Sequence, residues 1–161
     1  GKFDNVLLMG PLYHLSDVGD RKKCVREAKK HLAADGVLFA SFITLTAGLN
    51  YYYDLCPEGL LNEPAMDLFD RMERDESWSG MAFTQATFIN SREVLPFFEE
   101  LGFEKIALAG QEGLAGPRLT YIENAEKAVR DLYLQLSLRV CENPQYFAYS
   151  DHLLYVGRPK K

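Results

Sequence analysis

Two nearly unbroken apolar runs, one on each side of an amphipathic segment, constrain the fold of this chain more than any other feature. The runs are VLLM at residues 6–9 and VLFASFI at residues 37–43. Strands that are apolar at every position are typical of parallel sheets, because helices cover both faces of such sheets. The residues between them, 17–33, carry apolar side chains at helical spacing. We therefore predict a right-handed βαβ unit and an α/β fold.

The predicted helix over residues 17–33 separates its apolar and basic side chains. Its apolar stripe consists of Cys24, Val25, Ala28 and Leu32. Its basic side chains are Arg21, Lys22, Lys23, Arg26, Lys29 and Lys30. A surface helix commonly turns its apolar stripe to the core and its charges to water. We expect the basic face to be solvated.

Residues 45–81 interrupt the alternation of strands and helices, so we predict a lid or insertion there. We predict a helix over 63–74, with Pro64 in its first turn, where a missing N–H costs nothing. Three tyrosines at 51–53 and Trp78 flank this helix. An aromatic segment after a central strand is typical of a lid or substrate wall. A simple cover over the sheet edge is an equally good interpretation.

After residue 81 the sequence returns to regular elements. We predict that the whole chain, residues 1–161, forms one domain. We predict an extended segment at 82–89, a helix from Asn90 to Gly102, a strand at 103–108 and a loop at 110–117. A longer helix with one apolar face follows at 123–141, and a last strand at 153–157. Pro96 lies beyond the first turn of its helix, so that helix should begin late or bend there.

Charge and cysteine content limit the partners. The 161 residues have a net charge of -5 at pH 7, whereas a nucleic-acid interface needs a basic face, so we expect no nucleic-acid partner. The three cysteines are widely spaced and match neither a disulfide framework nor a metal motif, which favours the cytoplasm. The acidic residues of the insertion are scattered around a helix and predict no metal site. No apolar run reaches membrane-spanning length, so we expect no membrane partner.

Residues 3–15, with the sequence FDNVLLMGPLYHL, resemble the fourth strand and following loop of class I S-adenosylmethionine-dependent methyltransferases. The similarity is greatest to the small-molecule branch related to the ubiquinone-biosynthesis methyltransferases. It continues through HLAADGVL at 31–38 and ends with HLLYVGR at 152–158. The resemblance implies a partial Rossmann-like sheet of parallel strands with an antiparallel last strand and a helical insertion after the second strand. It also implies an enzyme that transfers a methyl group from S-adenosylmethionine to a small-molecule acceptor.

Two cofactor-binding elements of that family have no counterpart in the sequence. The family has a glycine-rich loop after its first strand and an acidic residue at the end of its second, but this chain contains no G-x-G. The chain also begins almost directly on a strand that we predict to be buried. We therefore expect it to be the C-terminal portion of a longer protein and inactive alone. Its open, apolar sheet edge should make it self-associate.

The segment after the first apolar run holds the expected cofactor and catalytic residues. The resemblance implies that Gly10, Pro11 and Leu12 lie beside S-adenosylmethionine. Tyr13 and His14 would then lie between cofactor and acceptor, and we predict catalytic roles for both. An imidazole titrates near neutral pH, so His14 is the candidate general base or hydrogen-bond partner. A histidine that only fixes the loop is the alternative.

Residues further along the chain form the expected substrate wall. They are Tyr53, Trp78, Phe83, Thr84 and His152. If the last strand is antiparallel, its start at His152 lies at the same sheet edge as the carboxyl ends of the other strands. Glu112 follows another strand and could approach this edge too, although a turn is the favoured interpretation. Ordinary packing is the alternative for each of the aromatic residues.

Two other classes of function stay open. A nicotinamide-dependent reductase is another α/β enzyme that binds a nucleotide, but the expected antiparallel last strand and the missing glycine fingerprint disfavour it. The other class is a non-catalytic interaction module derived from a methyltransferase. Fold similarity does not define a methyl acceptor, so methylation of oxygen, nitrogen or carbon fits the sequence equally.

Overall fold

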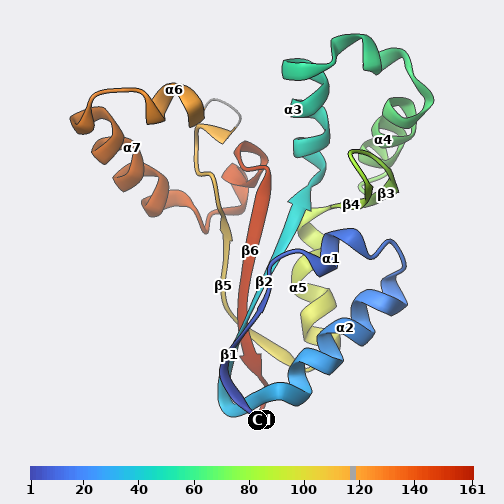
Figure 1. The fold of residues 1–161 in the computed structure, drawn as a ribbon, viewed down its shortest axis with the longest axis vertical. Helices are drawn as coiled ribbons and strands as arrows, with labels where there is room; N and C mark the ends of the chain where they lie inside the picture. The colour runs from blue at the N-terminus through green and yellow to red at the C-terminus, as the bar shows by residue number, and fades with distance from the viewer. Residues whose placement is uncertain (117–118) are drawn as a thin grey trace.

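A single six-stranded sheet organises the chain. The structure is a computed structural model and describes residues 1–116 and 119–161. The strands are β1 (Phe3–Leu8), β2 (Leu32–Thr44), β3 (Trp78–Met81), β4 (Gln85–Ile89), β5 (Phe103–Gly110) and β6 (His152–Pro159). They lie in the order β3-β4-β2-β6-β5, and β1 also pairs with β2. Figure 1 shows the long strands β2, β6 and β5 side by side in the middle of the molecule.

Helices connect these strands and extend beyond one end of the sheet (Figure 1). The α-helices are α1 (Pro11–His14), α2 (Val18–His31), α3 (Leu45–Leu55), α4 (Glu63–Glu73), α5 (Ser91–Glu100), α6 (Leu119–Glu123) and α7 (Lys127–Val140). Two 3-10 helices, η1 (Pro57–Leu61) and η3 (Pro144–Tyr149), complete the described elements. No helix in residues 1–116 or 119–161 combines the length and the apolar character needed to cross a membrane.

Strand β2 carries most of the pairing. Strand β6 runs antiparallel to it from Leu38↔Gly157 to Ile43↔His152. On its other edge two strands run parallel to it. Strand β1 pairs with residues 37–40 of β2, and β4 pairs with residues 43 and 44 of β2. The predicted α/β class, the parallel first pair, the antiparallel last strand and the helical insertion after the second strand are therefore confirmed.

Several boundaries differ from the sequence prediction. The extended segment predicted at 82–89 is a hairpin, in which β3 and β4 are antiparallel and residues 82–84 form the turn. Helix α5 begins at Ser91, where the side chain of Asn90 accepts a hydrogen bond from Arg92 N at 3.0 Å, so a late start because of Pro96 is excluded. The helix predicted over 123–141 is α7, which begins four residues later at Lys127, and the short helix α6 precedes it. The last residue of the predicted loop at 110–117 lies outside the described residues.

The basic face of α2 is only partly solvated, which corrects the prediction. Arg21 is buried, and its Nη1 donates to the carbonyls of Leu15 and Ser16 at 2.7 and 2.9 Å. It also donates to Oγ1 of Thr87 on β4 at 3.1 Å. Lys29 Nζ donates to the carbonyls at 101 and 102, where α5 turns into β5. The long basic side chains of α2 thus reach carbonyls of the turn before it, the Thr87 hydroxyl of β4 and the carbonyls after α5.

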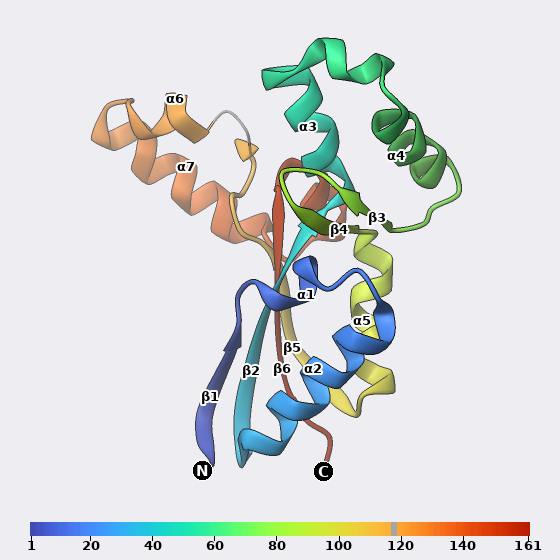
Figure 2. The same ribbon diagram turned by 45° about the vertical axis from the view of Figure 1, so that its right-hand side comes forward.

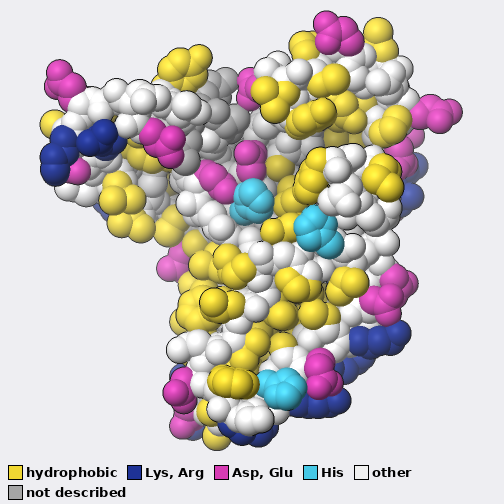
Figure 3. Space-filling view, viewed as in Figure 1, with side chains coloured by type: hydrophobic (Ala, Val, Ile, Leu, Met, Phe, Trp, Pro, Cys, Tyr) yellow, Lys and Arg dark blue, Asp and Glu magenta, His cyan; other side chains and the backbone are white. Residues whose placement is uncertain are grey.

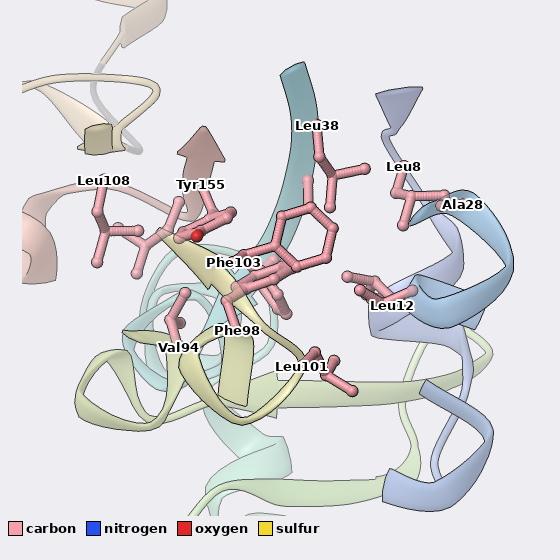
Figure 4. Packing of buried hydrophobic residues seen from close by; sticks show 14 of the residues in the cluster. Leu8, Leu12, Ala28, Leu38, Val94, Phe98, Leu101, Phe103, Leu108 and Tyr155 are labelled. Atoms are coloured by element: carbon pink, nitrogen blue, oxygen red, sulfur yellow. The ribbon is translucent and has the colours of Figure 1, made fainter. Parts of the chain in front are cut away.

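The main core lies between the sheet and the helices α2 and α5. The rings of Phe98 and Tyr155 stack with centroids 3.7 Å apart and planes 4° from parallel. Phe42 and Phe103 meet the Phe98 ring edge to face, each at 5.9 Å. Figure 4 shows Phe98, Phe103 and Tyr155 gathered at the centre of this cluster. These aromatic contacts fix α5 against β5 and β6.

Strand β1 is an open edge, contrary to the prediction of a fully buried strand. It pairs only with β2 among the described strands, and Figure 2 shows it at the outer side of the sheet. Leu8 is buried, but the Leu7 side chain is 64% exposed and Phe3 and Met9 are exposed as well. The apolar run thus identifies the strand correctly, but no other described strand pairs with the second edge of β1.

Helix α7 also presents apolar side chains to solvent. Figure 1 shows α6 and α7 extending sideways from the sheet. The exposed residues are Val129, Leu132, Leu134, Leu136 and Leu138. Helical periodicity had marked an apolar face here, yet no described element covers it.

Candidate functional site

A cavity of about 510 Å³ lies beyond the carboxyl end of β2, under the insertion of residues 45–81. Helices α3 and α4 and the β3–β4 hairpin enclose it, and the start of β6 forms its floor. Its walls are mostly aromatic, with Tyr51, Tyr52, Trp78, Phe83 and Phe88 among the lining residues. Ligands of open α/β sheets bind at this edge, beyond the carboxyl ends of the parallel strands.

The insertion is held in place by contacts that its sequence supplies. Thr44 caps α3 by accepting a hydrogen bond from Ala47 N at 3.1 Å. A Cβ atom at Gly48 would come within 2.9 Å of Leu68 and Phe88, so only glycine permits the close packing of α3 on α4 and β4. Trp78 Nε1 donates to Asp67 Oδ2 at 2.7 Å, which ties β3 to α4. The cavity walls are therefore built from packed elements.

A histidine–carboxylate pair lies at the edge of the cavity. His152, which lines the cavity, donates from Nδ1 to Glu112 Oε1 at 2.7 Å. Its backbone N–H donates to the other oxygen of the same carboxylate, Oε2, at 3.0 Å. Glu112 comes from the loop after β5, and its carbonyl accepts a hydrogen bond from the Tyr133 hydroxyl of α7. The backbone N–H fixes the carboxylate, and the carboxylate in turn orients the imidazole ring through Nδ1.

The pair shifts both pKa values. Burial raises the pKa of Glu112, but the hydrogen bonds and charge of His152 outweigh burial, so the pKa lies below its ordinary value. The hydrogen bond with Glu112 raises the pKa of His152 against the opposing effect of burial, and the charges of Glu112 and Asp151 add to the increase. Asp151 is itself held by Asn50 Nδ2 of α3 at 2.9 Å.

Tyr13 and His14 lie next to this pair. The Tyr13 ring is 4.7 Å from the His14 ring and 6.2 Å from the His152 ring, measured between centroids. His14 Nδ1 donates to the carbonyl of Gln85 at 3.2 Å, and its ring meets Phe83 at 6.0 Å. Figure 3 shows two histidine side chains near each other in the middle of one face, beside apolar side chains. The structure thus brings together four of the predicted residues: Tyr13, His14, Phe83 and His152.

The residues predicted to bind the cofactor form the turn after β1. A Cβ atom at Gly10 would meet only Tyr13 Oη, at 3.8 Å, so the space beside this backbone is open. Pro11 is exposed at the start of α1, whereas Leu12 is fully buried in the core and offers a ligand only its backbone. The backbone at Gly10 and the side chain of Met9 are therefore both accessible at this turn.

The remaining predicted residues divide between the cavity and its surroundings. Trp78 lines the cavity, whereas Tyr53 and Thr84 are exposed and lie outside its lining. The prediction missed Glu112 as a partner of His152. Antiparallel pairing of Gly110 with Leu153 places the residues after β5 beside those before β6, so the register of these two strands would have identified it. Within the described residues, no three His, Cys, Asp or Glu side chains cluster as metal ligands would.

We expect the pair to make the stability of the protein depend on pH in a defined way. A carboxyl with a lowered pKa stabilises the fold above its unfolded pKa of about 4.3, and an imidazole with a raised pKa does so below its unfolded pKa of about 6.5. The pair therefore stabilises most between these values. Replacing His152 with glutamine should cost more stability near pH 5.5 than near pH 8.5, as measured by urea denaturation.

A second, exposed pair supplies the control for this measurement. His31 Nε2 lies 3.4 Å from Glu27 Oε1 on α2, far from the cavity, and both side chains are largely exposed. Exposed pairs contribute little to stability, so His31→Gln should change the free energy of unfolding less at either pH. An equal loss for His152→Gln at both pH values would contradict the prediction.

Comparison with known proteins supports the architecture. No protein-family model matches the chain, and no curated protein matches it significantly. An S-adenosylmethionine-dependent methyltransferase from Clostridium acetobutylicum is similar over 99% of this chain and 59% of its own, with a TM-score of 0.51 and 8% identity. PKMT2 from Rickettsia typhi is similar over 99% of this chain and 36% of its own, with a TM-score of 0.48 and 12% identity.

An O-methyltransferase of a trans-AT PKS multienzyme from Brevibacillus brevis, solved in complex with S-adenosyl-L-homocysteine, is also similar. It is 9% identical with a TM-score of 0.46, over 99% of this chain and 44% of its own. The chain therefore spans less than two thirds of the length of these structures. The similarity to the Clostridium acetobutylicum protein shows that the chain has the fold of class I methyltransferases. The expected link to the ubiquinone-related branch stays a prediction.

Proposed function

We propose that this chain is the acceptor-binding portion of a longer protein that transfers a methyl group from S-adenosylmethionine to a small molecule. One observation carries the proposal: the cavity opens at the edge where the parallel strands β1, β2 and β4 end, next to the turn after β1. Ligands of this class of sheet bind at that edge. The insertion covers part of the cavity, while Tyr51 and Phe83 of its lining stay exposed to solvent.

The residues of the turn after β1 would hold one side of the cofactor. Gly10 and Pro11 would lie along it, and Leu12 would contribute its backbone. When bound, S-adenosylmethionine supplies an activated methyl group. The protein's own contribution is to orient the acceptor toward that group and to exclude water. Tyr13 and His14, between the turn and the cavity, are proposed to act in catalysis by hydrogen-bonding the reacting group of the acceptor.

The acceptor would lie in the cavity against Trp78, Phe83 and His152. Tyr53 and Thr84 are exposed, and each follows a lining residue in the sequence, Tyr52 and Phe83. They would therefore contact only a part of the acceptor that projects from the cavity. Cys24, Cys56 and Cys141 are free thiols, which fits the reducing cytoplasm that we propose for this protein.

Cofactor binding tests the proposed function directly. The gene product that includes the residues preceding this chain should bind S-adenosyl-L-homocysteine in a calorimetric titration and be stabilised by it against heat. Gly10→Val should weaken this binding at least tenfold, because the new side chain occupies the open space beside the turn. A melting temperature of the ligand-free variant within a few degrees of the wild type would show that folding is preserved.

Val18→Ala, at an exposed site at the start of α2, is the matched control and should bind like the wild type. Absence of both heat and thermal stabilisation at millimolar ligand would overturn the methyltransferase proposal.

The isolated chain should self-associate through β1. The strand has an unpaired edge among the described strands and exposed apolar side chains, and such edges pair with other chains. Leu7→Lys should therefore lower the dimer fraction measured by light scattering. Leu61→Lys is the control, because Leu61 is 88% exposed on η1 and far from that edge. A wild-type chain that stays monomeric at high concentration would contradict this prediction.

A further inference from the structure

We propose that the methyl acceptor is a hydroxylated aromatic compound, and that its hydroxyl proton passes to Nε2 of His152, which Glu112 holds in position. This inference rests on the proposed function and specifies both the chemical class of the acceptor and the group that receives its proton. Three observations carry it: the composition of the cavity walls, the geometry of the histidine–carboxylate pair, and the charges around it.

The cavity walls select for a flat, uncharged molecule. Its volume of about 510 Å³ lies within the range of small-molecule sites. Trp78 and Phe88 form a tilted pair 5.2 Å apart at the back, and Phe83 lies on the hairpin. Aromatic rings pack favourably against other rings. Among the described lining residues there is no Lys or Arg, so an acceptor that enters as an anion meets no fixed positive charge, whereas a hydroxyl that gives its proton to His152 gains the imidazolium as its partner.

The pair leaves one imidazole nitrogen available to the acceptor. A carboxylate accepts hydrogen bonds only, so Nδ1 of His152 must carry the proton that points to Glu112 Oε1. In the neutral ring, Nε2 then has a free lone pair. In the part of the chain that the structure describes, no hydrogen bond engages Nε2, and the side chain lines the cavity. A hydroxyl bound in the cavity is the partner that this nitrogen lacks.

The surrounding charges favour a proton on His152. Glu112 faces it from the loop after β5, Asp151 precedes it, and Tyr13 faces it from α1. Helix α3 adds only the neutral Asn50, which is bonded to Asp151. The two carboxylates raise the pKa of His152 and therefore its strength as a base.

The proposed step is balanced in atoms and charge. The hydroxyl oxygen of the acceptor forms a bond to the methyl carbon, and the bond from that carbon to sulfur breaks with its electron pair left on sulfur. The hydroxyl proton passes to Nε2, so the positive charge lost at sulfur reappears on the imidazolium. Glu112 faces that charge at Nδ1. Glu112 is thus a positioning residue, and His152 is the catalytic one.

Binding of para-nitrophenol tests the inference without any methyl transfer. Its phenolate form absorbs visible light and its neutral form does not. Bound to the wild-type protein slightly below the pKa of the free phenol, its phenolate fraction should rise severalfold. His152→Gln should bind the phenol without this rise, and Glu112→Gln should show a smaller rise. His31→Gln, which removes the exposed pair on α2, should behave as the wild type.

Catalysis and nuclear magnetic resonance supply two further measurements. With a phenolic acceptor, His152→Gln should lower kcat by about 100-fold or more and change KM little. The rate rises with pH as His152 loses its proton, so Glu112→Gln, which lowers the pKa of His152, should move that rise to lower pH. The imidazole resonances of His152 should show the same direction of shift, while those of His31 stay unchanged.

The outcomes separate this inference from the proposed function. Binding of S-adenosyl-L-homocysteine together with an unchanged phenolate fraction, or with an equal fraction in His152→Gln, would overturn the inference and leave the methyltransferase proposal intact. Loss of the phenolate rise in His14→Gln but not in His152→Gln would also overturn it and assign the proton to His14. Melting temperatures of all variants within a few degrees of the wild type show that the folded site is being compared.

Discussion

Replacing Phe98 with alanine is expected to lower the free energy of unfolding by about 3–5 kcal/mol, the range for a large aromatic side chain removed from a packed core. Phe98 is fully buried, and its ring stacks on Tyr155 while Phe42 and Phe103 meet it edge to face. Alanine would remove all three ring contacts and leave a cavity between α5 and the sheet. Urea denaturation measures the loss, and the melting temperature should fall by roughly 10 °C.

An exposed aromatic residue supplies the comparison. Tyr121 of α6 has 81% of its surface exposed, so Tyr121→Ala should change the free energy of unfolding by less than about 0.5 kcal/mol. A loss of less than about 1 kcal/mol for Phe98→Ala would mean that the core around α5 is not packed as described.

Replacing Arg21 with alanine is expected to cost about 2–4 kcal/mol of stability. The guanidinium is buried and joins the turn before α2 to β4 through the carbonyls of Leu15 and Ser16 and the hydroxyl of Thr87. Burial lowers the pKa of Arg21, although Glu93 and Asp17 partly oppose the effect. Alanine leaves these acceptors without their donor. Thermal melting monitored by circular dichroism would report the loss.

Two variants on the same helix test the cause of that loss. Lys23 is exposed and, among the described residues, pairs only with Asp20, so Lys23→Ala should change stability far less than Arg21→Ala. Arg21→Lys keeps the charge but lacks the planar group that reaches several acceptors, and it should fall between wild type and Arg21→Ala. If Lys23→Ala and Arg21→Ala proved equally destabilising, the buried hydrogen bonds would not be the reason.

Local sequence patterns predicted the parts of the fold that depend on local chemistry. The two apolar runs identified β1 and β2, and helical spacing located α2 and α4 close to their observed bounds. The start of the last strand at His152 and its antiparallel direction also agree with the structure. The strands and helices depend on patterns that repeat within one segment, whereas the antiparallel direction of the last strand was implied by the family resemblance.

Features that depend on distant segments could not be predicted in the same way. Periodicity found the apolar face of α7 but not whether anything covers it, and most of that face is exposed. In the sequence, Arg21 cannot be told from the other basic residues of its helix. Its hydrogen bond to Thr87 of β4, a distant segment, is what distinguishes it. Within the candidate site, Tyr13, His14, Phe83 and His152 were predicted and lie together. Glu112 was missed as their partner because its role depends on the register of β5 and β6.

The shared edge of β2 has a geometric consequence for both halves of the proposed site. Strand β1 pairs with β2 as far as Ala40, and β4 begins to pair at Ile43, three residues further along. Strand β4 runs parallel to β2, so Gln85, three residues before Phe88, lies level with Ala40, where the pairing of β1 ends. The hairpin turn and the turn after β1 are therefore neighbours, and His14 joins them through the Gln85 carbonyl and the Phe83 ring. One added or deleted residue of β2 between Ala40 and Ile43 would shift the two turns past one another by about 3.3 Å and turn every later side chain of β2 to the opposite face. This short stretch of β2 therefore keeps the proposed cofactor side and the acceptor side of the site in contact.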